Sequence, residues 1–561
     1  MNSFRQIIVL VFLAALCNFL AQPNELFLGG NWFFGIFSFI PLYILALRYT
    51  KRQNVFAGYV YALLTTLSNY FWLANFGDYS LWTIGSVSIL NMIFHGAFFS
   101  LVHYLIGSSE FRPAHGHGRL QDRWHDQWQW QDRWLRPLLF AMAWTAFEFF
   151  KSRGYLAFPW NLAAFPFHNW LTLNQIGELA GIWPISFVIF LLQSSIAELI
   201  SSMNNRPSKN RLHEPALRYV LCAAAILLAF NLYGFFRLNN VRLEQGEGEN
   251  EEPVIVLLVQ QNADSWSRGE EISALQTLIG LSNDGIDESL RTYGRVPDIV
   301  SWSETSLRYP YNPNNAFFAE NPPGISFREY LAGSNTDLIT GAPIVRSERV
   351  YMNGVIHLDS GGNALGDYGK IHLIPFAEHI PLTNLPLFAN FLENTIGLYP
   401  SGWTPGEGIR TFHFADSKLR IGTPVCFEDS FATNARAFAQ DGADLLLNLT
   451  NNSWSRTQSA QYQHFVAARY RAIETRRPLL RATNSGLTSI IMPDGSIHNH
   501  IPMFEPAYLL AEIHVNRNAG ISFYTRYGDW FAWLVGAGMV LVLIKRVLPV
   551  TARRTGHPAA G

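Results

Sequence analysis

The chain has 561 residues, of which 49% are hydrophobic, 14% aromatic and only 15% charged, with a formal net charge of −1. A soluble domain carries about 25% charged residues, so this composition indicates that part of the chain lies in lipid. A near-neutral chain has little attraction for nucleic-acid phosphates, which excludes a nucleic-acid partner. The length predicts at least two structural units. Two of the three cysteines, Cys17 and Cys222, lie in apolar runs, so no disulfide framework is expected.

Long apolar runs fill the first part of the chain and return once near its end. They cover roughly 6–21, 31–47, 55–73, 81–106, 137–150, 173–200, 218–236 and 528–544. Most have the ~17 to 25 residues that are needed to cross a hydrocarbon core. We therefore expect a membrane protein with eight transmembrane helices, seven in a domain over 1–240 and one C-terminal helix over 527–547.

The distribution of Lys and Arg predicts how these helices are oriented. Both ends of the chain and the second, fourth and sixth loops carry basic residues, whereas the first and third loops, "PNELFLGGN" and "ANFGDYS", carry none. Basic loops stay in the cytoplasm, so both termini are expected to be cytoplasmic. The segment from about 240 to 525 then lies outside the cytoplasm. Lys151 and Arg153, in the fifth loop, are the exception to this pattern.

Two polar features of the membrane part have no clear role in the sequence. The 107–136 loop contains His115, His117 and His125, but no acidic or thiol partners at ligand spacing, so a polar cytoplasmic loop is favoured over a metal site. Glu148 lies in an apolar helix, where a carboxyl group is costly and usually has a partner or a function. No metal and no cofactor are expected anywhere in the chain.

The composition changes after the charged linker "QGEGENEEP" at 245–253, where a second domain over 253–518 is expected to begin. Apolar, β-branched runs predict buried strands. They are "VIVLLVQQN", "DIVSWSE", "DLITGAPIV", "RIGTPVCFE", "ADLLLNLTN", "TSIIMP" and "YLLAEIHV". Helical patterns lie between them, in "EISALQTLIGLSNDGIDESLRTY", "ATNARAFAQDG" and "YQHFVAARYRAIETRR". Alternating strands and helices predict a layered α/β domain.

Reactive side chains follow three of these strands or lie near them. Glu304 ends "VSWSE", Lys370 lies in "YGKIHLIPFAE" eight residues before Glu378, and Cys426 ends the run "GTPVC". Ligand sites in α/β domains assemble at the carboxyl ends of strands. Each residue alone has an ordinary explanation as a surface carboxylate, a solvated lysine or a packed thiol.

Taken together and in this order, the three motifs resemble the nitrilase, or carbon–nitrogen hydrolase, superfamily, whose members use a Glu–Lys–Cys triad on an α-β-β-α sandwich. Seven helices before such a domain and one after it are similar to the apolipoprotein N-acyltransferase family of the bacterial inner membrane. Further stretches carry this resemblance over essentially the whole chain. They are "AFPWNLAAF", "NQIGELAGIWPISFVIF" and "YQHFVAARYRAIETRRPLLRATNSG".

The resemblance implies an activity, its substrates and a cellular location. A fatty acyl chain would pass from a glycerophospholipid to the free α-amino group of the N-terminal diacylglyceryl-cysteine of a bacterial apolipoprotein. Cys426 would form a thioester in a ping-pong cycle, with Glu304 as the general base and Lys370 as the electrostatic partner. The catalytic domain would lie on the periplasmic side of the inner membrane. The partners would be the donor phospholipid, the lipoprotein acceptor and the bilayer, with the protein itself a monomer.

Five further residues match supporting positions of the family: Glu378, Phe427, Glu428, Trp266 and Trp454. Glu378 is expected to hold either Lys370 or the geometry of the acyl-enzyme. Glu428 either assists the nucleophile or forms a strand-edge salt bridge. The family commonly has Tyr where this chain has Phe427. The two tryptophans lie near the site or in an ordinary core. The stretch "PLTNLPLFANFLENTIGLYPSGWTPG" is interpreted as a lid that dips into lipid, with a packed surface loop as the alternative.

Two other functions were weighed against acyl transfer to an amine. A membrane-tethered amidase would use the same triad with water as the acceptor, but a hydrolase of small soluble amides has no use for seven helices before its active site. A transporter with a degenerate soluble domain would need paired intramembrane charges and inverted repeats, whereas Glu148 stands almost alone and the triad is intact.

Overall fold

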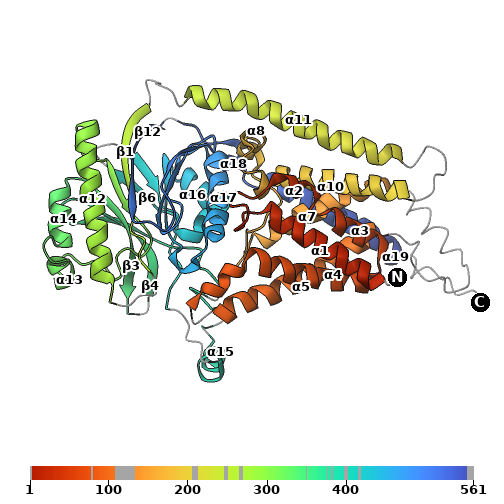
Figure 1. The fold of residues 1–561 in the computed structure, drawn as a ribbon, viewed down its shortest axis with the longest axis horizontal. Coiled ribbons are helices and arrows are strands. Elements are labelled where there is room, and N and C mark those ends of the chain that lie inside the picture. Colours follow the sequence, from red (N-terminus) through yellow and green to blue (C-terminus); the bar gives the residue numbers. More distant parts are fainter. Residues whose placement is uncertain are drawn as a thin grey trace, which may run out of the picture.

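The protein consists of a helical bundle joined end to end with a two-sheet sandwich (Figure 1). The structure is a computed structural model. It describes residues 3–77, 80–107, 133–204, 213–244, 251–264, 269–348, 350–375, 377–380, 383, 385–396, 402–414, 419–517 and 519–551. The three histidines of the 107–136 loop and Trp266 lie outside these described residues.

Each of the eight apolar runs falls on helical structure in the bundle. The main helices are α1 (Ser3–Ala21), α2 (Trp32–Phe37), α3 (Ile40–Arg48), α4 (Lys51–Asn69), α5 (Ser80–Ile106), α7 (Arg136–Lys151), α10 (Trp183–Asn204), α11 (His213–Glu244) and α19 (Trp530–Thr551). Short helical turns η1 (Phe71–Asn75), η5 (Phe165–Phe167), α8 (Leu171–Asn174) and α9 (Gly177–Ala180) connect them. Within the described residues, α1, α5, α10 and α11 are long and apolar enough to cross a membrane, and the segment Trp32–Arg48 is apolar but shorter.

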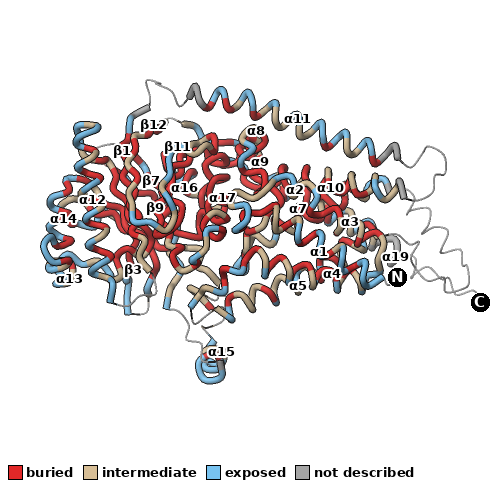
Figure 2. The backbone as a smooth tube through the Cα atoms, in the orientation of Figure 1, coloured by how far each residue is buried: buried red, intermediate tan, exposed pale blue. Residues whose placement is uncertain are grey.

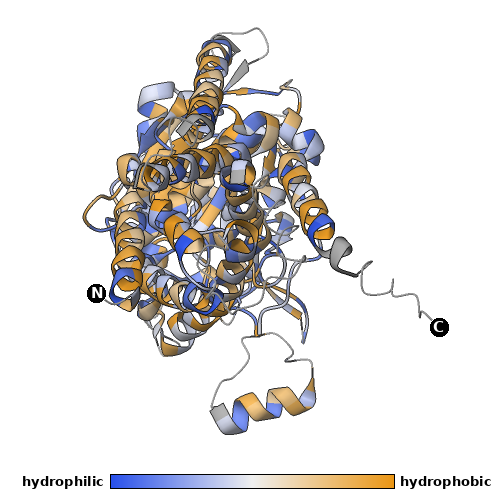
Figure 3. Cartoon of the chain, turned by 90° about the vertical axis from the view of Figure 1, so that its right-hand side faces the viewer, coloured by the Kyte–Doolittle hydropathy of each residue, from blue (hydrophilic) through white to orange (hydrophobic). Residues whose placement is uncertain are grey.

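The surface of the bundle has the character expected of a protein in lipid. Large apolar side chains point outward from several helices, among them Phe12, Ile89, Leu228 and Leu232. Figure 3 views the bundle along its length and shows apolar residues distributed over the helices. Since an aqueous surface disfavours a continuous apolar cover, these helices are expected to face hydrocarbon.

The second part of the chain forms two six-stranded sheets. The first has the order β12-β1-β2-β3-β4-β5 and the second the order β11-β10-β9-β8-β7-β6. The strands of the first are β1 (Glu251–Gln260), β2 (Ile299–Trp302), β3 (Leu338–Ser347), β4 (Val350–Leu358), β5 (Ala364–Gly369) and β12 (Ala507–Asn516). Those of the second are β6 (Thr411–Phe414), β7 (Leu419–Gly422), β8 (Leu445–Asn451), β9 (Leu479–Asn484), β10 (Ser489–Ile491) and β11 (Ile497–His500).

Helices cover the outer face of each sheet, which gives the four-layered sandwich that the family resemblance implied. In the first sheet β1, β2 and β3 are parallel neighbours, covered by α12 (Glu271–Tyr293), α13 (Ala316–Glu320) and α14 (Phe327–Ser334). In the second sheet β7, β8 and β9 are parallel, covered by α16 (Ala432–Gln440) and α17 (Gln458–Thr475). The seven predicted strands and three predicted helices are all present. Strands β4, β5, β6, β9 and β11 were not predicted.

Helix α17 lies between the second sheet and the bundle, so nearly all of its residues are buried although its sequence is polar (Figure 2). Its polar side chains bond to the bundle. Gln463 Nε2 donates to the Pro23 carbonyl at 2.8 Å, and Tyr470 Oη donates to the Ala164 carbonyl at 2.8 Å. These contacts fix the catalytic-domain fold on the end of the bundle.

The stretch interpreted as a lid contains the short helix α15 (Pro386–Phe391), which stands away from the rest of the molecule (Figure 1). Its residues are not buried, and Leu387 is 88% exposed. An exposed apolar helix of this kind suits contact with lipid, and the lid remains a prediction.

Candidate active site

The two sheets bring Glu304, Lys370 and Cys426 together. Glu304 follows β2 and Lys370 follows β5, both in the first sheet, while Cys426 follows β7 in the second. Lys370 Nζ lies 3.3 Å from Glu304 Oε1, and the Cys426 thiol hydrogen-bonds to the Glu304 side chain. The lysine side chain is 0% exposed and that of Glu304 5%. A carboxylate that touches both the thiol and the ammonium can accept the thiol proton.

Burial and charge set the protonation states of this cluster. Burial raises the pKa of the Cys426 thiol well above its usual range, and the negative charge of Glu304 raises it further, against the opposing effect of Lys370. Burial alone would lower the pKa of Lys370, but Glu304 and Glu378 together raise it well above its ordinary value. The resting state therefore pairs a neutral thiol with a permanent ammonium, so the thiol must lose its proton to a neighbouring base as it attacks.

Two asparagines that the sequence did not single out orient Glu304. Asn353 Nδ2, from β4, donates to Oε1 at 2.7 Å, and the Asn451 backbone N–H, at the end of β8, donates to Oε2 at 2.8 Å. The backbone just after Glu304 passes so close to β3 that position 341 requires glycine. A Cβ at Gly341 would lie 2.4 Å from the Thr305 backbone nitrogen. An asparagine inside a strand, as in "YMNGV", is the signal that could have pointed to Asn353.

Glu378 lies where it can hold the lysine. Its Oε1 accepts from Lys370 Nζ at 2.8 Å and from Asn353 Nδ2 at 3.0 Å, and its Oε2 accepts from the Ile374 backbone N–H at 2.8 Å. Glu378 thus supplies Lys370 with a second carboxylate partner in addition to Glu304.

Glu428 links the two sheets through hydrogen bonds, and its Oε1 also lies 3.8 Å from His372 Nδ1. Its side chain is 0% exposed. Its Oε1 accepts from the backbone N–H groups of Ile371 at 2.7 Å and His372 at 3.1 Å, and its Oε2 accepts from Val425 N–H at 2.8 Å. The Tyr368 hydroxyl donates to both oxygens. Glu428 thus holds the residue before the nucleophile against the residues that follow Lys370.

The turn that carries Cys426 is η7 (Cys426–Ser430), in which the cysteine adopts a left-handed φ of +50°. This backbone conformation costs of order 1–3 kcal/mol in a non-glycine residue and requires support from its surroundings. The Cys426 carbonyl accepts hydrogen bonds from Asn448 Nδ2 at 3.1 Å and from His464 Nε2 at 3.2 Å.

His464 is itself held by a buried polar chain that the sequence did not reveal. Asn452 Nδ2 donates to Nδ1 at 2.9 Å, so Nε2 carries the proton that it shares between the Cys426 carbonyl and Asp429 Oδ1, 2.6 Å away. The second Asp429 oxygen lies 3.4 Å from Arg481 Nε, whose side chain is 1% exposed. The buried aspartate and arginine fix the imidazole, and the imidazole supports the strained turn.

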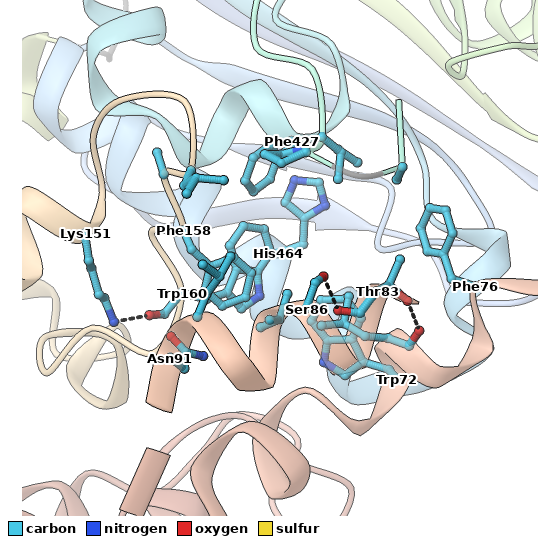
Figure 4. Close-up of a pocket in the computed structure, with 18 of the residues that line it drawn as sticks. Trp72, Phe76, Thr83, Ser86, Asn91, Lys151, Phe158, Trp160, Phe427 and His464 are labelled. Atoms are coloured by element: carbon cyan, nitrogen blue, oxygen red, sulfur yellow. Dashed lines mark hydrogen bonds between the residues drawn. The ribbon is translucent and has the colours of Figure 1, made fainter. Parts of the chain in front are cut away.

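A cavity of about 340 Å³ joins the thiol to the membrane helices. Cys426 and Phe427 form its catalytic end, and Val87, Leu90, Phe94, Phe147 and Phe150 of α5 and α7 line the bundle end. Figure 4 shows Trp160 and Phe427 facing this cavity. Since Phe94 and Phe150 are also 45% and 52% exposed, the cavity reaches the bundle surface between α5 and α7.

Two of the predicted supporting aromatics lie in this cavity. Phe427 stacks on Trp160 with ring centroids 5.2 Å apart, and Trp454 packs against Phe76 at 4.5 Å. Trp160, in "AFPWNLAAF", was noted in the sequence only as part of a family stretch. In the structure, Trp160 contacts Phe427, the residue that follows the nucleophile.

Comparison with known proteins agrees with both parts of the chain. Residues 10–195 match the apolipoprotein N-acyltransferase N-terminal domain, and residues 298–520 match the carbon–nitrogen hydrolase family. The apolipoprotein N-acyltransferase 2 of Treponema denticola is 30% identical, over 96% of this chain and 96% of its own. The apolipoprotein N-acyltransferase 2 of Treponema pallidum is 31% identical, over 91% of this chain and 89% of its own. A solved carbon–nitrogen hydrolase from Helicobacter pylori G27 is 16% identical with a TM-score of 0.34, over 47% of this chain and 89% of that chain. The chain belongs to the apolipoprotein N-acyltransferase family and is an acyltransferase.

Proposed function

We propose that this enzyme moves a fatty acyl chain from a glycerophospholipid to the free α-amino group of the N-terminal diacylglyceryl-cysteine of an apolipoprotein. The observation that carries this proposal is the apolar cavity, which has the Cys426 thiol at one end and the exposed Phe94 and Phe150 side chains at the other. An acyl chain can enter it from lipid between α5 and α7 and present its ester to the thiol. A hydrolase of small soluble amides would not need this connection.

In the first half of the reaction, Cys426 Sγ attacks the ester carbonyl while its proton passes to Glu304. Lys370 stabilises the developing sulfur and oxyanion charges, together with a backbone N–H such as that of Phe427. The carbon–oxygen bond then breaks, and Glu304 returns the proton to the departing lysophospholipid. A thioester on Cys426 remains.

In the second half, the α-amino group of the acceptor attacks the thioester. Glu304 takes the amine proton, the carbon–sulfur bond breaks, and the proton returns to the leaving sulfur. The product amide and the free thiol restore the starting enzyme. Glu378 holds Lys370 through both halves, Glu428 and Trp454 support the site, and Phe427 with Trp160 forms the cavity wall next to the thioester. Trp266 is assigned a supporting place near the site from its position in the family motif.

We place the enzyme in the bacterial inner membrane as a monomer that crosses it eight times. The division is a seven-helix domain over 1–240, a periplasmic catalytic domain over 253–518 and a final helix over 527–547, with both termini cytoplasmic. The support for this orientation is the positive-inside distribution of Lys and Arg.

The decisive experiment looks for the thioester by mass. Purified full-length enzyme is incubated with a phospholipid that carries labelled chains, and we expect one hydroxylamine-sensitive acyl group on Cys426. A diacylated lipopeptide should discharge it and receive the label as an amide. Cys426→Ala should abolish labelling, while Cys222→Ala serves as the matched cysteine control. Labelling that persists in Cys426→Ala, or discharge to water as fast as to the lipopeptide, would refute the proposal.

A further inference from the structure

We propose that Lys151 and Arg153 form the site that binds the phosphate of the donor phospholipid, an inference that rests on the proposed function. These two cations are the exception to the basic-residue pattern of the loops, since they lie at the outer end of α7. Basic residues are disfavoured on that side of a membrane protein, so their presence there calls for a local function.

Both cations line the cavity that contains Cys426. Among the described residues of its lining, Lys151 and Arg153 are the only Lys or Arg, and no Asp or Glu lines it. A cavity with two cations, no carboxylate and otherwise mostly apolar walls favours a ligand that has a long apolar part and one anionic group. A phospholipid has both.

The contacts of Lys151 leave it able to bind an anion. Its Nζ donates one hydrogen bond, to the Trp160 carbonyl at 2.8 Å, which Figure 4 shows at the edge of the cavity. Glu148, one turn earlier on α7, attracts this ammonium electrostatically but does not hydrogen-bond to it. Its two oxygens accept instead from the Ala163 backbone N–H and the Ser186 hydroxyl, each at 2.7 Å.

Arg153 is held in place beside the same cavity. Its guanidinium pairs with Asp529 and lies over the Phe149 ring, 4.4 Å from the centroid. A planar guanidinium has five N–H donors, so one carboxylate does not use all of them. With Arg153 partly neutralised by Asp529, Lys151 is the principal anion ligand and Arg153 the second.

A phosphate site would allow the enzyme to select the ester of the donor over the esters of the acceptor. The acceptor also carries fatty esters on its diacylglyceryl group, and Cys426 could attack these as readily as the donor ester. The acceptor has no phosphate, whereas every glycerophospholipid has an anionic phosphate a few bonds from its esters. A cationic site in the cavity that contains the thiol therefore favours the donor in the first half-reaction, by electrostatic attraction that the acceptor cannot match.

The test compares two donors with the same acyl chains on the same full-length enzyme. Phosphatidylglycerol has the phosphate and diacylglycerol does not, and the measurement is the ratio of their rates of thioester formation on Cys426. We expect wild type to prefer the phospholipid and Lys151→Gln to reduce this ratio roughly tenfold or more, the effect of losing one charge-assisted contact. Since a ratio is independent of the fraction of folded enzyme, it remains valid if the variant is less stable.

Two further variants test whether the positive charge at position 151, rather than a general effect of substitution, sets the ratio of the two donor rates. Lys151→Arg keeps the cation and should retain most of the preference, while Lys51→Gln, a matched change at the exposed start of α4, should leave the ratio unchanged.

Two outcomes would overturn the inference. They are an unchanged ratio in Lys151→Gln or an equal loss in Lys151→Arg. Failure of the proposed function is a different result, namely no thioester in wild type with either donor.

Discussion

Replacing Glu428 with glutamine tests whether the buried carboxylate positions the nucleophile. Glutamine has nearly the same shape, but one of its two terminal atoms is an NH₂ group that cannot accept a hydrogen bond. If its oxygen keeps the bonds to Ile371 and His372, its nitrogen faces the Val425 N–H, which now sits 2.8 Å from Oε2. That buried N–H then loses its acceptor.

The expected magnitude follows from these contacts. An unpaired buried N–H costs about 1–3 kcal/mol, and the remaining bonds lose their charge-assisted part. We expect Glu428→Gln to destabilise the catalytic domain by about 2–4 kcal/mol. The larger effect should be on the rate, because Val425 directly precedes the nucleophile. A misplacement of about 1 Å at a reacting group can cost roughly 10²-fold.

The assay measures thioester formation on Cys426 per folded enzyme, together with the apparent melting temperature in detergent. Glu407→Gln is the matched control, since Glu407 is 77% exposed and lies 3.9 Å from its partner Arg346. The control should change neither quantity measurably. If Glu428→Gln forms the thioester within twofold of wild type, Glu428 does not position the nucleophile and the reasoning is wrong.

Two other substitutions test the electrostatics of the site. Glu304→Gln removes the charge that raises the pKa of Cys426, so alkylation of that thiol by iodoacetamide should begin at lower pH while acyl transfer is lost. An alkylation midpoint that stays or rises, followed by peptide mass against pH, would contradict this assignment. Asp429→Asn leaves the Arg481 guanidinium buried without its counter-charge, which should destabilise the fold by about 3–5 kcal/mol. An unchanged melting temperature in a thermal scan would show that the pair is not needed.

Much of this protein is encoded locally, in patterns that can be read along the chain. Long apolar runs need lipid or a core, and β-branched runs need a sheet, so the bundle and most of the parallel strands were predictable. The unpredicted strands β4, β9 and β11 contain polar residues such as Asn353 and Arg481, whose partners lie far away in the sequence. The triad was recognisable because Glu304, Lys370 and Cys426 each occur within a characteristic motif.

Only the tertiary structure decided which polar groups meet. Helix α17 has a charged sequence suited to a solvent-facing helix, yet Arg469 and Glu474 are buried because the sheet and the bundle enclose the helix from two sides. In the same way, Lys151 was visible in the sequence only as an exception to the charge pattern. The packing of α5, α7 and the catalytic domain around one cavity brings it to the cavity that contains the nucleophile. The periodicity of a sequence records which residues avoid water, but a contact between distant residues depends on how whole elements pack, and no local pattern contains that information.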